Sequence, residues 1–239
     1  MSQAEALVGF VAKWRARWPE WNIAQVFMPA AQRETADAWF ALLQELTDAA
    51  WGGSDPTPGL AKLAWWLEEL RGWSKGARRH PLGDALQRLP APWTALAASL
   101  MALQQSRERP ENAETAIAAM GPFVESVAEC ELALFGTSPE TSVDAMATIE
   151  SSLFGQRLLA DPDAAVPLGI PGAAADPTVS AHAWAERLLT DWQQVATRPR
   201  RLQAAFVRAR LAHFAATGRH EPLAPWRALL VAWQAARKA

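Results

Sequence analysis

Acidic residues one helical turn apart have the greatest capacity for chemistry in this sequence. Two carboxylates at such spacing can bind Mg²⁺, because this hard cation prefers oxygen ligands and accepts substrate phosphate oxygens as further ligands. The candidates among such pairs are Glu34 with Asp37, Glu45 with Asp48, and Glu125 with Glu129. The same spacing is typical of a solvated helix face, so the residues alone leave both interpretations open.

Other motifs for catalysis or metal binding are missing from the sequence. It has no glycine-rich phosphate loop and no nucleophile elbow. Its four histidines, His80, His182, His213 and His220, include no pair at i and i+4, so a histidine-based metal site is not expected. The single cysteine, Cys130, can form neither an internal disulfide nor a multi-cysteine metal site, which fits a reducing compartment.

Helical periodicity predicts the elements that position these acids. Boundaries at proline and glycine indicate helices over residues 3–18, 29–51, 60–70, 81–89, 93–105, 111–134, 138–159, 178–196, 200–217 and 222–237. No sustained alternation or β-branched run predicts a strand. Residues 161–177 are rich in proline, glycine and aspartate, and we expect an irregular loop there, either functional or simply connecting. The sequence therefore predicts an all-α protein with one domain over 1–239 and roughly ten helices.

The helix over 29–51 carries the acid pair at Glu45 and Asp48. One of its faces is apolar and is expected to be buried; it comprises Trp39, Leu42, Leu43, Leu46 and Ala50. The opposite side carries a polar stripe of Arg33, Asp37, Gln44 and Asp48, flanked by Glu34 and Glu45. This stripe is the side on which a solvated face or a metal site would lie.

Thirteen tryptophans and no tyrosine make the aromatic content unusual. Two of them are adjacent, at Trp65 and Trp66, in the helix predicted over 60–70. Neighbouring side chains point about 100° apart on a helix, so one can enter the core while the other reaches a second surface. Either both belong to the core and its rim, or one of them lines a ligand cavity.

Charge and hydropathy limit the classes of partner. The net charge of −2 predicts no nucleic acid or other polyanion partner. Residues 197–239 nevertheless carry nine Lys and Arg against one acid, Glu221, so this basic segment either docks on the acidic body or offers a surface for anionic lipid or diphosphate. No apolar run approaches the roughly 20 residues that span a bilayer, and no signal-peptide pattern opens the chain, so we expect no transmembrane segment and a cytoplasmic location.

Between residues 27 and 90, several short segments resemble in order and spacing the N-terminal third of the squalene/phytoene synthase family. They are Phe27-Met28-Pro29 followed by Arg33, the Glu45-Leu46 helix end, Asp55-Pro56, Lys62-Leu63-Ala64-Trp65-Trp66 with Glu68-Glu69-Leu70, His80-Pro81 and Ala85-Leu86. The resemblance implies an all-α isoprenoid-synthase fold with a central cavity. Active members of the family join two prenyl diphosphates head to head, and two Asp-rich helical motifs bind Mg²⁺ and the diphosphates.

The sequence departs from that family at the acidic motifs. Where the resemblance places the first motif, the chain has Glu45 and Asp48 but no DxxxD. No second DxxxD is found, and the Arg-Tyr element that should follow it is impossible because the chain has no tyrosine. The pattern is closer to the branch of catalytically degenerate relatives that includes mitochondrial complex I assembly factors.

Three functions follow as hypotheses. The first is a non-catalytic relative whose cavity or groove binds a lipid, a prenyl compound or a protein partner. The second is an active prenyltransferase, in which Glu45 and Asp48 bind Mg²⁺, Arg33 contacts diphosphate, and Trp65 or Trp66 lines the pocket. The third is a membrane-peripheral scaffold without a relevant cavity, attached through residues 3–18 and the basic segment. For residues 3–18, the alternative is a core helix with snorkelling basic side chains.

Overall fold

The computed structural model describes residues 3–136, 143–170, 177–190, 192–193 and 195–237. These ranges contain twelve α-helices, one 3₁₀-helix and no strand, so the prediction of an all-α helical domain is confirmed. The helices are α1 (Gln3–Arg17), α2 (Trp21–Ala24), η1 (Gln25–Phe27), α3 (Ala30–Trp51), α4 (Thr57–Trp73), α5 (Leu82–Leu86), α6 (Trp93–Gln105), α7 (Ala113–Phe135), α8 (Val143–Ala160), α9 (Pro162–Ala165), α10 (Pro177–Thr190), α11 (Arg198–Thr217) and α12 (Pro225–Arg237).

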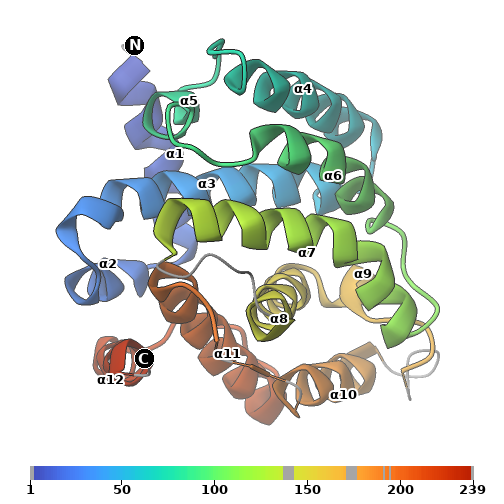
Figure 1. Cartoon of the computed structure of the whole chain (residues 1–239). Helices are drawn as coiled ribbons and strands as arrows, with labels where there is room; N and C mark the ends of the chain where they lie inside the picture. Colours follow the sequence, from blue (N-terminus) through green and yellow to red (C-terminus); the bar gives the residue numbers. More distant parts are fainter. Residues whose placement is uncertain (1–2, 137–142, 171–176, 191, 194, 238–239) are drawn as a thin grey trace.

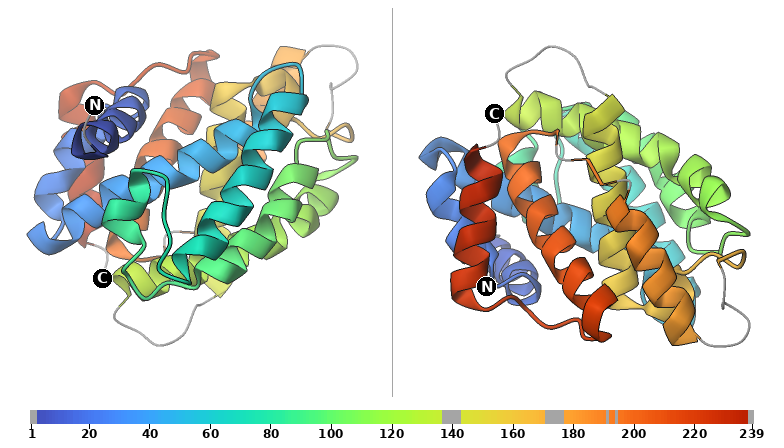
Figure 2. Two further views of the ribbon diagram at one scale, coloured as in Figure 1. Left: turned by 90° about the horizontal axis from the view of Figure 1, so that it is seen from above. Right: turned by 90° about the horizontal axis from the view of Figure 1, so that it is seen from below.

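The helices are arranged around two long ones, α3 and α7, which cross the middle of the molecule (Figure 1). Helix α3 packs against α1, α4, α5 and α6, and these elements form the upper half. In the lower half, α8 is enclosed by α7, α9, α10 and α11. Helix α12 lies at the edge, against α11, α2 and η1, as the view from below in Figure 2 shows.

Local sequence explains where the main helices begin and end. Pro29 immediately precedes α3, and Pro58 lies in the first turn of α4, where its missing N–H has no helical partner to lose. The side chain of Asn112 caps α7 by accepting a hydrogen bond from the N–H of Thr115 at 2.8 Å. Gly218 ends α11 with φ of +71°, in the left-handed region that glycine adopts without a Cβ clash.

Most helix boundaries lie within three residues of the predicted ones, and two predictions were wrong by more than that. Residues 161–177 are not irregular throughout, because Pro162–Ala165 form the short helix α9, whose first turn is capped when Asp161 accepts from the N–H of Ala164. Proline favours the first helical position because the N–H that it lacks has no partner within the helix there, whereas the prediction treated this proline as a helix breaker. Helix α10 ends at Thr190 and does not continue to 196. Residues 171–176 of the expected loop, and 137–142 at the expected start of α8, lie outside the described residues.

Two buried ion pairs tie the basic segment to the body. The guanidinium of Arg200 donates to the Glu131 carboxylate from Nε at 3.0 and 3.1 Å and from Nη2, and Trp39 Nε1 donates to the same carboxylate at 2.8 Å. Arg210 binds Glu20 through Nε at 2.8 Å and through Nη2. Docking of the basic segment on the acidic body is thus realised by these two arginines.

We predict that Glu131→Gln lowers the free energy of unfolding by about 3–5 kcal/mol, because it leaves the guanidinium of Arg200 buried without a counter-charge. Urea denaturation followed by circular dichroism measures this loss. The control is Glu129→Gln on the exposed side of the same helix, which should stay within about 0.5 kcal/mol of the wild type. Equal effects of the two substitutions would show that the ion pair contributes nothing of its own.

Candidate functional site

The polar stripe of α3 is not a solvated face, as a plain amphipathic helix would suggest. Asp37, Gln44 and Glu45 are buried because α1 lies across this side of α3. Trp14 of α1 and Trp18, which directly follows this helix, are buried, and the other described residues of α1 are half-buried or exposed. The basic side chains between these tryptophans, Arg15 and Arg17, form ion pairs with Asp37 and Asp48 of α3.

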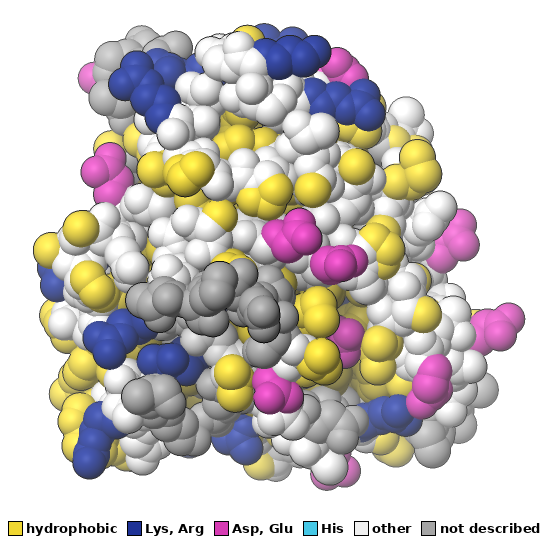
Figure 3. Space-filling model, viewed as in Figure 1, with side chains coloured by type: hydrophobic (Ala, Val, Ile, Leu, Met, Phe, Trp, Pro, Cys, Tyr) yellow, Lys and Arg dark blue, Asp and Glu magenta, His cyan; other side chains and the backbone are white. Residues whose placement is uncertain are grey.

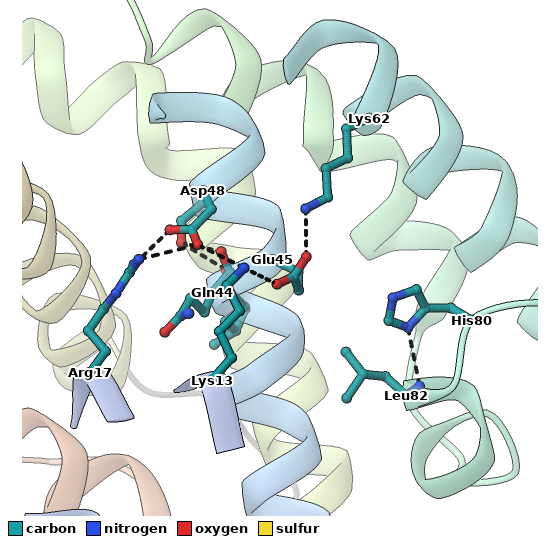
Figure 4. Close-up of polar contacts among 10 residues, drawn as sticks. Lys13, Arg17, Gln44, Glu45, Asp48, Lys62, His80 and Leu82 are labelled. Atoms are coloured by element: carbon teal, nitrogen blue, oxygen red, sulfur yellow. Dashed lines mark hydrogen bonds and ion pairs between the residues drawn. The ribbon is translucent and has the colours of Figure 1, made fainter. Parts of the chain in front are cut away.

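The candidate acid pair lies in a cluster of five charged side chains from three helices, which we call the Glu45 cluster (Figure 4). Lys13 Nζ donates to Glu45 Oε1 at 2.7 Å, and Lys62 Nζ of α4 donates to Glu45 Oε2 at 2.5 Å. Arg17 Nη1 donates to Asp48 Oδ1 at 2.7 Å, and Lys13 Nζ lies 3.6 Å from Asp48 Oδ2. Three cations therefore surround two carboxylates.

The electrostatics of the cluster favour its charged state. Burial raises the pKa of Glu45, but the hydrogen bonds and charges of Lys13 and Lys62 outweigh burial and hold this pKa below the ordinary value of 4.5. Burial lowers the pKa of Lys13, but the hydrogen bonds and charges of Glu45 and Asp48 outweigh burial and raise this pKa above its ordinary value of 10.5. At neutral pH the cluster is thus a stable set of ion pairs joining α1, α3 and α4.

This donor set does not fit Mg²⁺. Both oxygens of Glu45 already accept from lysines, and both oxygens of Asp48 face cations of α1. A divalent cation would have to displace ammonium and guanidinium groups that the fold holds in place. Within the described ranges, no group of three or more His, Cys, Asp or Glu side chains is placed to hold a metal ion. Glu34, Glu125 and Glu129, from the other predicted pairs, are exposed.

The two adjacent tryptophans differ in burial, although their rings contact each other edge to face with centroids 5.2 Å apart. Trp66 is fully buried and packs against His80, with ring centroids 4.5 Å apart, and against Trp73. Trp65 is 36% exposed and lies under the guanidinium of Arg79, 5.1 Å from the ring centroid. Trp66 thus belongs to the core, and only Trp65 has surface available to a ligand.

His80 has the turn role expected from its place before Pro81. Its Nδ1 accepts a hydrogen bond from the N–H of Leu82 at 3.2 Å (Figure 4). Burial lowers the pKa of His80 to about 4, against the opposing charges of Glu45 and Glu69, so the imidazole is neutral at pH 7. It has therefore no charge to offer a ligand.

Arg33 also serves the chain locally. Its Nε and Nη2 both donate to the carbonyl oxygen of Met28 at 3.3 Å, which ties the end of η1 to the start of α3. The structure thus brings Glu45 and Asp48 together, as predicted. Trp65 and Trp66 contact each other and His80, whereas Arg33 binds the carbonyl oxygen of Met28.

Helix α12 forms an apolar surface whose residues were not among the predicted site residues. Its outward side chains are large and apolar: Trp226 is 68% exposed, Leu229 51%, Leu230 46% and Trp233 44%. Its inward side chains are Ala228, Ala232 and Ala235. We call the four large side chains the outer face of α12. The sequence shows both sets at helical spacing, the large side chains at i, i+3, i+4 and i+7 and the alanines at i, i+4 and i+7. It does not show which set packs against the rest of the protein.

Comparisons with known proteins do not assign this chain to a family. No protein-family model matches it, and no curated protein is significantly similar to it. Kinship with the squalene/phytoene synthases therefore stays a prediction. Among the described residues, none of the helices combines the length and the apolar composition that a bilayer span requires.

We predict that Glu45→Gln destabilises the protein by about 1.5–3 kcal/mol at pH 7, because two charge-assisted hydrogen bonds are lost. The pKa of Glu45 is lowered in the folded state, so its contribution is present above pH 4.5 and is lost as the pH falls through the folded value. Urea denaturation across pH measures the difference, which should vanish in acid.

The matched control is Glu34→Gln, an exposed carboxylate on the same helix, which should change stability little at any pH. A loss for Glu45→Gln that persisted unchanged in acid would contradict the role of the carboxylate charge.

Proposed function

We propose that this protein is a non-catalytic lipid-binding relative of the squalene/phytoene synthases, and that the outer face of α12 attaches it to an anionic membrane surface. The observation that carries the proposal is the reversed amphipathicity of α12, which turns alanines toward the protein and tryptophans and leucines toward solvent.

The reversed arrangement leaves unused apolar surface. A surface helix ordinarily buries its largest apolar side chains against the core. Full burial of such a side chain is worth about 1.5–3 kcal/mol, so docking of the outer face would regain several times RT before the costs of association. Trp226, Leu229, Leu230 and Trp233 are close enough along one helix to enter a single interface together.

The charges around the outer face favour an anionic lipid surface as its partner. Residues 222–239 contain no acid, and the described exposed bases there are Arg227 and Arg237. The Arg237 guanidinium lies 4.5 Å from the ring centroid of Trp233, which places a cation beside an apolar anchor. Tryptophan prefers the interface between lipid and water, and each base near an anionic membrane contributes about 1 kcal/mol.

A groove extends the same surface toward α11. It has a volume of about 610 Å³ and lies between α11 and α12, with Arg208 and Arg237 on its rim and Val231 on its wall. Figure 3 shows hydrophobic and basic side chains next to one another at the lower left, over α12. A base on each side of a groove that also contains Val231 and Trp233 suits a molecule with an anionic head and an apolar chain.

The Glu45 cluster supports the non-catalytic part of the proposal. Metal-dependent prenyl transfer needs several Mg²⁺ ions to neutralise the leaving diphosphate. Here the corresponding acids neutralise the protein's own lysines and arginine instead.

Vesicle sedimentation tests the lipid proposal. The full chain should sediment with vesicles of phosphatidylcholine and phosphatidylserine, and less with phosphatidylcholine alone. Trp226→Ala with Trp233→Ala should weaken binding at least tenfold, and Arg227→Gln with Arg237→Gln should weaken it in a salt-dependent way. The control Met101→Ala with Ile117→Ala, which removes exposed apolar side chains from α6 and α7, should bind as the wild type does. Unchanged sedimentation of the tryptophan variant would overturn the proposal.

Calorimetry with farnesyl diphosphate, with and without Mg²⁺, tests the non-catalytic part. We expect no magnesium-dependent binding and no release of diphosphate. Magnesium-dependent release that disappears in Asp48→Ala would instead establish the active prenyltransferase with altered acids.

A further inference from the structure

A second site lies on the other side of the Glu45 cluster, in a cavity between α1, α3, α8 and α9. We call this cavity the Gln44 pocket. Its volume is about 260 Å³, and Arg17, Gln44, Asp48, Trp51 and Arg157 are among its lining residues. The Gln44 side chain points to the Arg17 side of α3, away from Lys62 (Figure 4).

Gln44 brings an unused acceptor to this pocket. The residue is only 7% exposed, yet its Oε1 has no hydrogen-bond partner among the described residues. A buried carbonyl oxygen without a donor is costly, so such an atom beside a cavity indicates a missing donor group. Asp48, one turn further along α3, lines the same wall, with Arg17 and Lys13 facing its two oxygens.

Arg157 brings an unused donor and an unbalanced positive charge. It is 5% exposed, and Nε has no partner among the described residues. Its other nitrogens donate to carbonyl oxygens, from Nη1 to Ser106 and from Nη2 to Arg107 at 3.0 Å and Ala164 at 3.2 Å. No carboxylate within salt-bridge distance of this guanidinium is found in the described part of the chain.

The pKa of Arg157 reflects that imbalance. Burial lowers it to about 10; the charge of Asp161 partly opposes this shift and that of Arg107 adds to it. The guanidinium also lies over the ring of Trp51, 5.3 Å from its centroid. A buried cation whose hydrogen-bond partners are all carbonyl oxygens is stabilised by an incoming anionic group.

We propose that the Gln44 pocket binds a small zwitterion of the α-amino acid class. The ligand's carboxylate meets Arg157, and its ammonium group donates to Gln44 Oε1 beside Asp48. A cavity of this volume holds roughly eight or nine groups the size of a water molecule, which matches an amino acid. The indole of Trp51 offers an apolar wall for the side chain of the ligand. This site is independent of the lipid-binding proposal.

Thermal-shift measurements and calorimetry on the full chain test the site, with each common α-amino acid used separately as the probe. At least one of them should raise the Tm and bind. The amide of that amino acid, which lacks the carboxylate, and its N-acetyl derivative, which lacks the ammonium group, should bind at least tenfold more weakly. The proposal is overturned if no amino acid binds, or if these two derivatives bind equally well.

Gln44→Leu tests the assigned acceptor, since leucine fills a similar volume without an oxygen. It should weaken binding of the amino acid at least tenfold, whereas Gln104→Leu, on the exposed side of α6, should not. Undiminished binding by Gln44→Leu would remove Gln44 from the site. Its sedimentation with anionic vesicles should equal that of the wild type, so failure of this proposal can be told apart from failure of the lipid-binding proposal.

Discussion

A carboxylate removed from water must be given donors, and this requirement organises the molecule. The described residues contain five buried acids, and each meets cations, indole N–H groups or backbone N–H groups; they are Glu20, Asp37, Glu45, Glu69 and Glu131. Three accept a hydrogen bond from a tryptophan Nε1. The tryptophans thus fill the core with apolar surface and also satisfy its acids. Glu20, Glu45 and Glu131 take donors from distant segments and so join parts of the chain that are far apart in the sequence, whereas Glu69 takes its donors from its own helix and the segment that follows it.

The same requirement decides what the Glu45 cluster can do. Carboxylates that hold α1, α3 and α4 together through Lys13, Lys62 and Arg17 are not available as ligands without loss of those connections. A helical fold can in this way keep acids at a position that resembles a metal site while using them for stability. Two of the buried polar atoms without a partner among the described residues, Gln44 Oε1 and Arg157 Nε, belong to side chains that line the neighbouring Gln44 pocket.

Helix α12 shows the opposite use of a helix face. Its alanines allow close approach to α11 and α2, and its large side chains remain outside. The anchor of this arrangement is Glu20, which accepts from the backbone N–H of Leu223 at 2.7 Å as well as from Arg210. The buried ion pair therefore also fixes the segment that leads into α12, and with it the direction in which Trp226 and Trp233 point.

The sequence by itself determined the all-α class and most helix boundaries, because periodicity, proline and glycine act locally. It also determined that the side chains of Trp65 and Trp66 leave the helix in different directions, because neighbouring residues on a helix point about 100° apart. Only the tertiary structure decided that Gln44 and Glu45 are buried and that α12 turns its alanines inward. Those outcomes depend on which distant segment packs on a given face: α1 covers the polar stripe of α3 because its lysine and arginines neutralise the acids there, and neither the partner nor the pairing is written in the local pattern.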